Sequence, residues 1–163
     1  MKTADFRRNA AAGCASLILL AGPVKAQAVS VSAGYSGWTC CLADGGGATA
    51  ALRVDLPIGP VLLLEPGLTW LRLRNEGEAP DQTHYVLELS AQASLPIPGR
   101  VRPFLGLGAG FPSNTAGDFF IAVHAVAGLR LGLGPAWHLR AEFRAREARP
   151  IQGDLTLGIG RRL

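Results

Sequence analysis

Apolar and polar side chains alternate without a break along residues 137–146. Apolar residues occupy the odd positions from Trp137 to Ala145, and histidine or charged residues occupy the even positions from His138 to Arg146. A period of two over this length predicts a β-strand with two unlike faces. In a soluble sheet the apolar face is buried, whereas in a membrane barrel it contacts lipid and the polar face lines the interior.

Seven further segments alternate in a similar way, so the sequence predicts eight strands. Three connections, at 57–60, 96–99 and 132–135, are short and contain proline or glycine, and the others are longer and more polar. This asymmetry is typical of an up-and-down meander with both chain ends on the short-turn side. We therefore expect antiparallel strands at 29–37, 48–56, 61–74, 84–95, 101–110, 119–131, 137–146 and 154–163.

Proline and glycine modify two of the expected faces. Pro66 lies inside the third segment, and its missing N–H predicts an irregularity or a bulge there. Five glycines fall on polar faces, where we expect them to leave room for long arginine side chains from facing strands: Gly106, Gly108, Gly110, Gly158 and Gly160.

The first 28 residues have the three parts of a secretory signal peptide. Lys2, Arg7 and Arg8 are basic, residues 10–20 form a short apolar run, and residues 26–28 have the small-x-small form of a cleavage site. The run is too short to span about 30 Å of hydrocarbon as a helix. We expect cleavage after Ala28, which divides the chain into a signal peptide, 1–28, and a barrel domain, 29–163.

Removal of this leader also removes most of the basic excess. Residues 29–163 contain 12 arginines, no lysine and 11 acidic residues, which is a net charge of +1. No basic stripe with interleaved aromatic residues is present, so we expect no nucleic-acid partner. Cys40 and Cys41 are adjacent, a spacing that rarely forms a disulfide, and their oxidation state stays open.

Three observations favour the lipid-facing interpretation over a soluble barrel. One face of nearly every segment is apolar, the polar faces carry many charges, and a soluble outer surface would normally contain lysine, which residues 29–163 lack. Ten tilted residues also span roughly 25 Å, the height of the apolar band of an outer-membrane barrel. Turning Arg140 and Arg144 toward lipid would cost about 2–4 kcal/mol each. We therefore expect an all-β, eight-stranded antiparallel transmembrane barrel.

The polar faces then form a packed charged core, because an eight-stranded barrel is only wide enough for side chains to fill. We expect the buried histidines to bond to neighbouring carboxylates. We expect no catalytic residue, no metal site and no cofactor. The expected lumen network, with a structural role, consists of Arg53, Asp55, Glu65, Glu88, His124, Arg130, His138, Arg140, Glu142, Arg144 and Asp154.

Three C-terminal stretches resemble the small outer-membrane β-barrel proteins of the OmpA-type superfamily. Residues 102–110, RPFLGLGAG, are similar to that family's "R-P-Y-x-G-x-G-x-G" strand. Residues 127–130 and 137–144 resemble its next hairpin, and residues 158–163 resemble the C-terminal signal read by the barrel-insertion machinery. The chain differs at its end, where Leu163 stands in place of the usual Phe or Trp. The resemblance implies a barrel-only member, without a peptidoglycan-binding domain.

These observations predict an integral outer-membrane protein with a structural, surface-interaction or weakly pore-forming role. Its expected partners are outer-membrane lipids, lipopolysaccharide and the barrel-assembly machinery, and we expect a monomer. Two alternatives stay open: a lipid-modifying barrel enzyme, because His84, His124 and His138 are present, and a soluble lipocalin-like carrier. The sequence names no ligand for the segments around Trp38–Gly47 and Asn75–Gln82.

Overall fold

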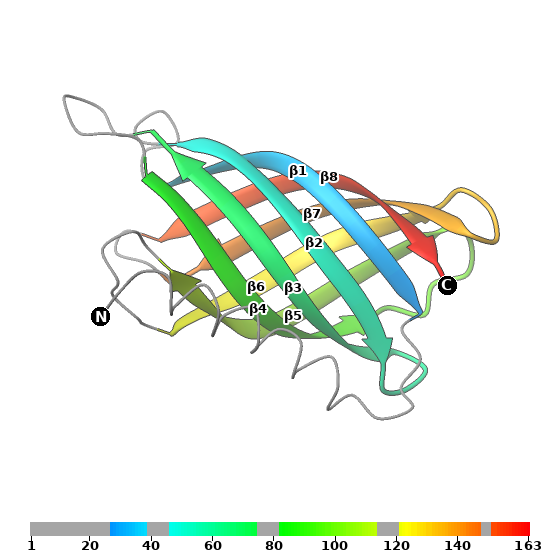
Figure 1. Ribbon diagram of the computed structural model, residues 1–163. Coiled ribbons are helices and arrows are strands. Elements are labelled where there is room, and N and C mark those ends of the chain that lie inside the picture. The colour runs from blue at the N-terminus through cyan, green and yellow to red at the C-terminus, as the bar shows by residue number, and fades with distance from the viewer. Residues whose placement is uncertain (1–26, 39–45, 75–81, 114–120, 148–150) are drawn as a thin grey trace.

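The computed structural model describes residues 27–38, 46–74, 82–113, 121–147 and 151–163. They form one closed antiparallel barrel in which each strand pairs with its neighbours in sequence order, and the last strand pairs with the first (Figure 1). The strands are β1 (Ala28–Trp38), β2 (Gly47–Pro57), β3 (Leu62–Leu73), β4 (Gln82–Ser94), β5 (Val101–Ser113), β6 (Ala122–Gly132), β7 (Trp137–Arg146) and β8 (Gln152–Arg162).

This order confirms the predicted fold, with small differences at the strand ends. Strand β5 continues to Ser113, past the point where we expected a loop at Phe111, because its ladder with β4 extends to Tyr85. Residues 1–26 of the predicted signal peptide lie outside the described residues, as do Cys40, Cys41 and Phe119. Gln27 is described, and Ala28 is the first residue of β1. No helix in the described part of the chain is long and apolar enough to cross a membrane.

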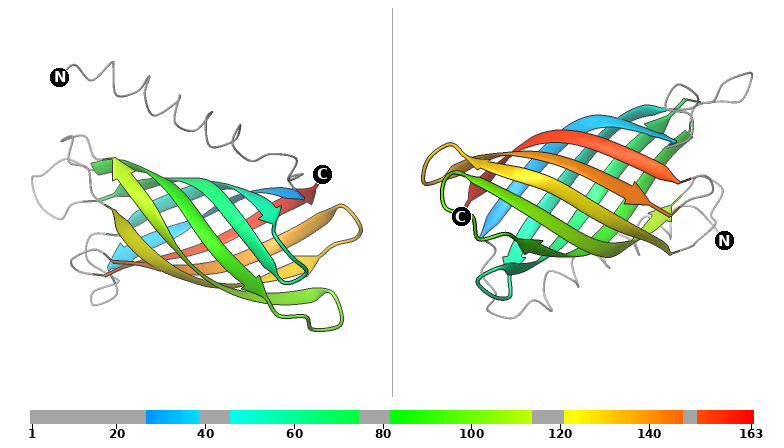
Figure 2. Two further views of the ribbon diagram at one scale, coloured as in Figure 1. Left: turned by 90° about the horizontal axis from the view of Figure 1, so that it is seen from below. Right: turned by 180° about the vertical axis from the view of Figure 1, so that it is seen from behind.

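The two ends of the barrel differ in the length of their connections. Residues 58–61, 95–100 and 133–136 join strands at one end. At the other end the connections are 39–46, 74–81, 114–121 and 147–151, of which the first three are longer than any at the first end. Both ends of the barrel chain lie at the short-turn end, where the Leu163 N–H donates to the Gln27 carbonyl (Figure 2). In outer-membrane barrels the short turns face the periplasm and the long loops face outward.

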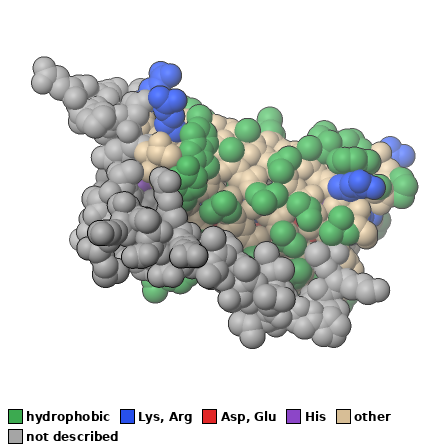
Figure 3. All heavy atoms as spheres, viewed as in Figure 1, with side chains coloured by type: hydrophobic (Ala, Val, Ile, Leu, Met, Phe, Trp, Pro, Cys, Tyr) green, Lys and Arg blue, Asp and Glu red, His purple; other side chains and the backbone are tan. Residues whose placement is uncertain are grey.

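The outer wall is apolar, as expected. Twenty-eight large hydrophobic residues are exposed in the described part of the chain, and Leu107, in the middle of β5, is 70% exposed. On the face seen in Figure 3, hydrophobic side chains are spread over the wall and arginines lie only toward its two ends. Trp70 and Tyr85 are cross-strand neighbours near the long-loop end, where an aromatic girdle is common in such barrels.

Pro66 interrupts one ladder without shifting it. The β2–β3 pairs skip Val54 and Asp55, opposite Pro66 and Glu65, and resume at Leu56 with the same register. On the β4 side the pairing is continuous. The predicted irregularity is thus a local loss of pairing on one side, not a bulge, because proline only removes a donor and no extra residue is inserted.

The glycines on the inner faces serve a different purpose from the one expected. A Cβ at Gly108 would lie 2.6 Å from the His124 imidazole, one at Gly160 would lie 2.3 Å from that of His138, and one at Gly128 would lie 2.5 Å from the ring of Phe104. Of the five glycines predicted to accommodate arginine, none has an arginine side chain among its nearest atoms; Gly67 does, 2.6 Å from Arg53. At Gly108, Gly128 and Gly160 the glycine therefore makes room for a ring on an adjacent strand.

Candidate functional site

The barrel interior is filled by polar side chains. All eleven residues of the expected lumen network are buried, and their side chains come from every strand except β1 and β5. A twelfth, Arg146, was omitted from that set although it lies on the same face of β7 as Arg140 and Arg144. Its even position in β7 is the signal that could have identified it. Whether these residues have a purely structural role stays a prediction.

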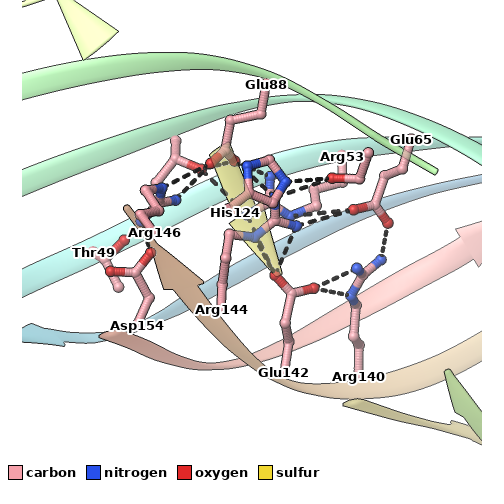
Figure 4. A network of polar contacts seen from close by, with 12 residues as sticks. Thr49, Arg53, Glu65, Glu88, His124, Arg140, Glu142, Arg144, Arg146 and Asp154 are labelled. Atoms are coloured by element: carbon pink, nitrogen blue, oxygen red, sulfur yellow. Dashed lines mark hydrogen bonds and ion pairs between the residues drawn. The ribbon is translucent and has the colours of Figure 1, made fainter. Parts of the chain in front are cut away.

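Three glutamates form the centre of the network (Figure 4). Glu65 on β3 accepts from Arg140 on β7, and Glu142 on β7 accepts from both Arg140 and Arg144. Arg144 Nη2 lies 2.9 Å from Glu142 Oε1 and 3.3 Å from Glu65 Oε1. Since β3 and β7 are not neighbours in the sheet, these ion pairs cross the lumen.

Glu88, on β4, is the third glutamate of this centre, and its ion pairs extend the network toward the long-loop end of the lumen. Its carboxylate lies 2.7 Å from the Arg53 guanidinium and 2.6 Å from that of Arg146, and it also accepts from the Thr69 hydroxyl. Arg146 in turn pairs with Asp154 on β8. Asp154 also accepts from Ser36 on β1, which extends the polar contacts to the seam of the barrel.

The buried charges balance. Five arginines and five carboxylates are buried among the described residues, so the interior is neutral without any bound ion. Balanced pairing offsets the large desolvation penalty that an isolated buried charge would carry. The set comprises Arg53, Arg130, Arg140, Arg144 and Arg146 with Asp55, Glu65, Glu88, Glu142 and Asp154.

Apolar residues complete the interior at two levels. The ring of Phe104 on β5 contacts the guanidinium groups of Arg130 and Arg140. Their Cζ atoms lie 4.3 and 4.8 Å from the centre of the ring. Leu71 and Leu73 are buried on the inner face of β3 near the long-loop end, where we had assigned no inward side chain. The lumen therefore contains cation–π contacts and a small apolar layer in addition to ion pairs.

The two buried histidines do not bond to carboxylates, contrary to expectation. His124 Nε2 lies 2.7 Å from an Arg144 nitrogen and 2.8 Å from the Ser90 hydroxyl. Because arginine can only donate, the lone pair of Nε2 accepts that hydrogen bond. His138 Nε2 has no hydrogen-bond partner among the described residues. In the described part of the chain, no group of three or more histidine, cysteine or acidic residues is placed to hold a metal ion.

Comparison with solved structures identifies the fold. Neisserial surface protein A superposes with a TM-score of 0.62 at 19% identity, covering 83% of this chain and 96% of that one. The N-terminal β-barrel domain of Pseudomonas aeruginosa OprF gives 0.59 at 13%, covering 85% and 100%. This chain has the fold of the small outer-membrane β-barrels. The outer membrane enzyme PagL shares it, with a TM-score of 0.57 at 12% identity over 82% and 97%.

No protein-family model and no curated protein matches the sequence. The predicted resemblance is therefore confirmed at the level of the fold. With its apolar outer wall, this fold indicates a protein of the bacterial outer membrane whose wall contacts lipid.

Proposed function

We propose that the protein is a closed, monomeric outer-membrane barrel that acts at the cell surface, in a structural or surface-interaction role, and conducts solutes weakly or not at all. In this proposal residues 1–28 are a cleaved signal peptide, residues 29–163 form the barrel, and β8 is recognised by the barrel-assembly machinery. The observation that carries it is the neutral set of ten buried charges, whose cross-lumen ion pairs fill the space a solute would need.

Planar-bilayer recording tests this proposal. We expect a low or absent steady conductance for the wild type. Glu142→Ala should increase it, because this substitution removes the carboxylate that joins Arg140 to Arg144 and leaves the volume of that side chain open in the lumen. Glu147→Ala is the matched control, since Glu147 is exposed beyond the end of β7. A large steady conductance of the wild type would contradict a closed lumen.

The lipid-modifying alternative has one observation in its favour besides the likeness to PagL, namely the hydrogen bond between Ser90 and His124. A catalytic serine of this kind needs a base with a free lone pair and access to its substrate. Here Nε2 accepts from Arg144, and Ser90 is 0% exposed in the middle of the lumen. These facts favour a structural pair. Lipid A acyl chains should therefore be the same with and without the protein; a change abolished by Ser90→Ala would favour the enzyme.

The soluble-carrier alternative requires an apolar cavity enclosed by a polar outer wall. The described residues have the opposite arrangement, with leucine, valine and isoleucine outside and arginine and glutamate inside. Fractionation with heat-modifiable gel migration separates the two, because a membrane barrel resists unfolding in detergent until it is heated. Recovery of the protein from the soluble periplasm would favour the carrier.

A further inference from the structure

A cavity of about 390 Å³ opens at the short-turn end of the barrel, and the lumen ion pair of Asp55 and Arg130 contributes to its wall. This volume is in the range of small-molecule sites. Four arginines contribute to its wall, Arg100, Arg102, Arg130 and Arg162, whereas Asp55 is its one acidic residue among the described residues. The turn at 57–63 forms a less polar wall. The cavity is thus strongly cationic.

This positive charge is not balanced elsewhere in the described part of the chain. Asp55 lies 3.6 Å from Arg130 and 3.7 Å from Arg140, so it already belongs to the neutral lumen set. No ion pair with a described residue is formed by Arg100, Arg102 or Arg162. Three cationic side chains at this mouth of the barrel therefore lack counter-charges among the described residues.

The strand register brings like charges together at the same place. Arg102 on β5 is the cross-strand partner of Arg130 on β6, and Arg130 is the partner of Arg140 on β7. Like charges directly opposite each other destabilise a sheet. Arg140 is compensated by Glu65 and Glu142, but Arg102 is not. An anion between Arg102 and Arg130 would remove this repulsion.

A second observation points into the same cavity. Arg130 is 8% exposed, and its Nε–H has no hydrogen-bond partner. An unsatisfied buried donor is destabilising, and more so when it is charged. Each terminal nitrogen of Arg130 donates one hydrogen bond, to Gln92 or to Ser94, whereas Nε donates none. Nε has almost no accessible surface, so an anion in the cavity reaches it only when the Arg130 side chain turns toward the cavity.

We propose that this cavity binds an oxyanion, a phosphate or carboxylate group, that enters from the periplasmic side and lies between Arg102 and Arg130. The arginine fork donates parallel hydrogen bonds to either group. Arg162 and Arg100 supply further positive charge at the mouth. The group can come from a free periplasmic solute or from a lipid headgroup of the inner leaflet, which the experiment distinguishes.

The test uses the exported protein in a maltoside detergent, which carries neither phosphate nor charge. Inorganic phosphate is titrated at constant ionic strength while the Arg130 Nε–H resonance is followed by NMR. We expect a saturable shift, and Arg102→Gln should weaken the apparent affinity about tenfold or more, because it removes a charged hydrogen-bond donor. Heat-modifiable migration verifies that each variant is folded.

Arg161→Gln is the matched control. It makes the same change in net charge at the same end of the barrel, but Arg161 is exposed and lies over the ring of Trp137 on the outer wall, 5.7 Å from its centre. It should alter the affinity by less than about twofold, because a rim charge on the other face acts only through screened long-range attraction. An equal loss in both variants would overturn the proposal, as would the absence of a saturable shift.

Repeating the titration in phosphatidylglycerol nanodiscs identifies the source of the anion. If a lipid headgroup occupies the site, the Arg130 Nε–H resonance of the wild type lies at its phosphate-bound position before phosphate is added. In Arg102→Gln the same resonance then moves away from that position. A resonance that still titrates with added phosphate assigns the site to a soluble anion. A resonance at its phosphate-free position that no longer responds to phosphate overturns the proposal for the membrane-bound protein.

Discussion

Replacing Glu88 by glutamine should destabilise the barrel by about 3–5 kcal/mol, the range for removing one partner of a buried ion pair. Glu88 is 2% exposed and lies against Arg53, Arg144 and Arg146, at distances of 2.7, 3.4 and 2.6 Å. The glutamine has nearly the same volume, so the change isolates the charge. It leaves five buried arginines with four carboxylates and presents an amide N–H₂ to the guanidinium groups. The cost is a large part of a typical net stability of about 5–15 kcal/mol.

The assay is equilibrium unfolding in guanidinium chloride from lipid vesicles, followed by tryptophan fluorescence and by gel migration. Glu147→Gln, at an exposed position, should stay within about 0.5 kcal/mol of the wild type. Combining Glu88→Gln with Arg146→Gln tests the pairing directly, since residues in one network are coupled. We expect the double variant to lose less stability than the sum of the single variants. A Glu88→Gln variant within 1 kcal/mol of the wild type, or strict additivity, would refute the reasoning.

Two further substitutions test the wall and the packing of the lumen. Leu107→Arg places a charge on the lipid face at the middle of β5 and should lower the free energy of unfolding by about 2–4 kcal/mol. Leu133→Arg, in a short turn, should lower it by about 0–1 kcal/mol. Both values are measured by unfolding from vesicles. Gly108→Ala puts a Cβ 2.3 Å from the Leu89 carbonyl oxygen and should cost about 1–3 kcal/mol, whereas Gly59→Ala, with nothing within 4 Å, should be nearly neutral. Equal effects within either pair would contradict the placement of these residues.

Side-chain alternation was sufficient to predict the strands and their faces. Because the period of a strand is two, one charged residue that must avoid lipid determines the orientation of every other residue in its strand. Strand β7 shows this clearly, since all its even positions are buried. The number of strands and the unequal connections then determined the closed antiparallel order.

The contacts across the lumen could not be predicted in the same way. Whether Arg140 meets Glu65 or Glu88 depends on the stagger of all the strands between β3 and β7, and alternation carries no information about stagger. The role of Gly108 was misjudged for this reason, because its nearest side chain belongs to His124 on the adjacent strand. Leu71 and Leu73 lie at odd positions of β3 like the inward Glu65, so their orientation followed from the pattern; they were missed because apolar side chains on a polar face resemble the outer wall.

The charges of the lumen are unevenly divided along the chain. Strands β1–β4 contribute one buried arginine and three buried carboxylates, whereas β5–β8 contribute four arginines and two carboxylates. The first half of the barrel is thus negative on its inner face by two charges, and the second half is positive by two. Before β1 and β8 pair, the two curved halves attract each other across the space between them. Closure of the barrel is therefore driven partly by electrostatic attraction between halves, and salt should slow it.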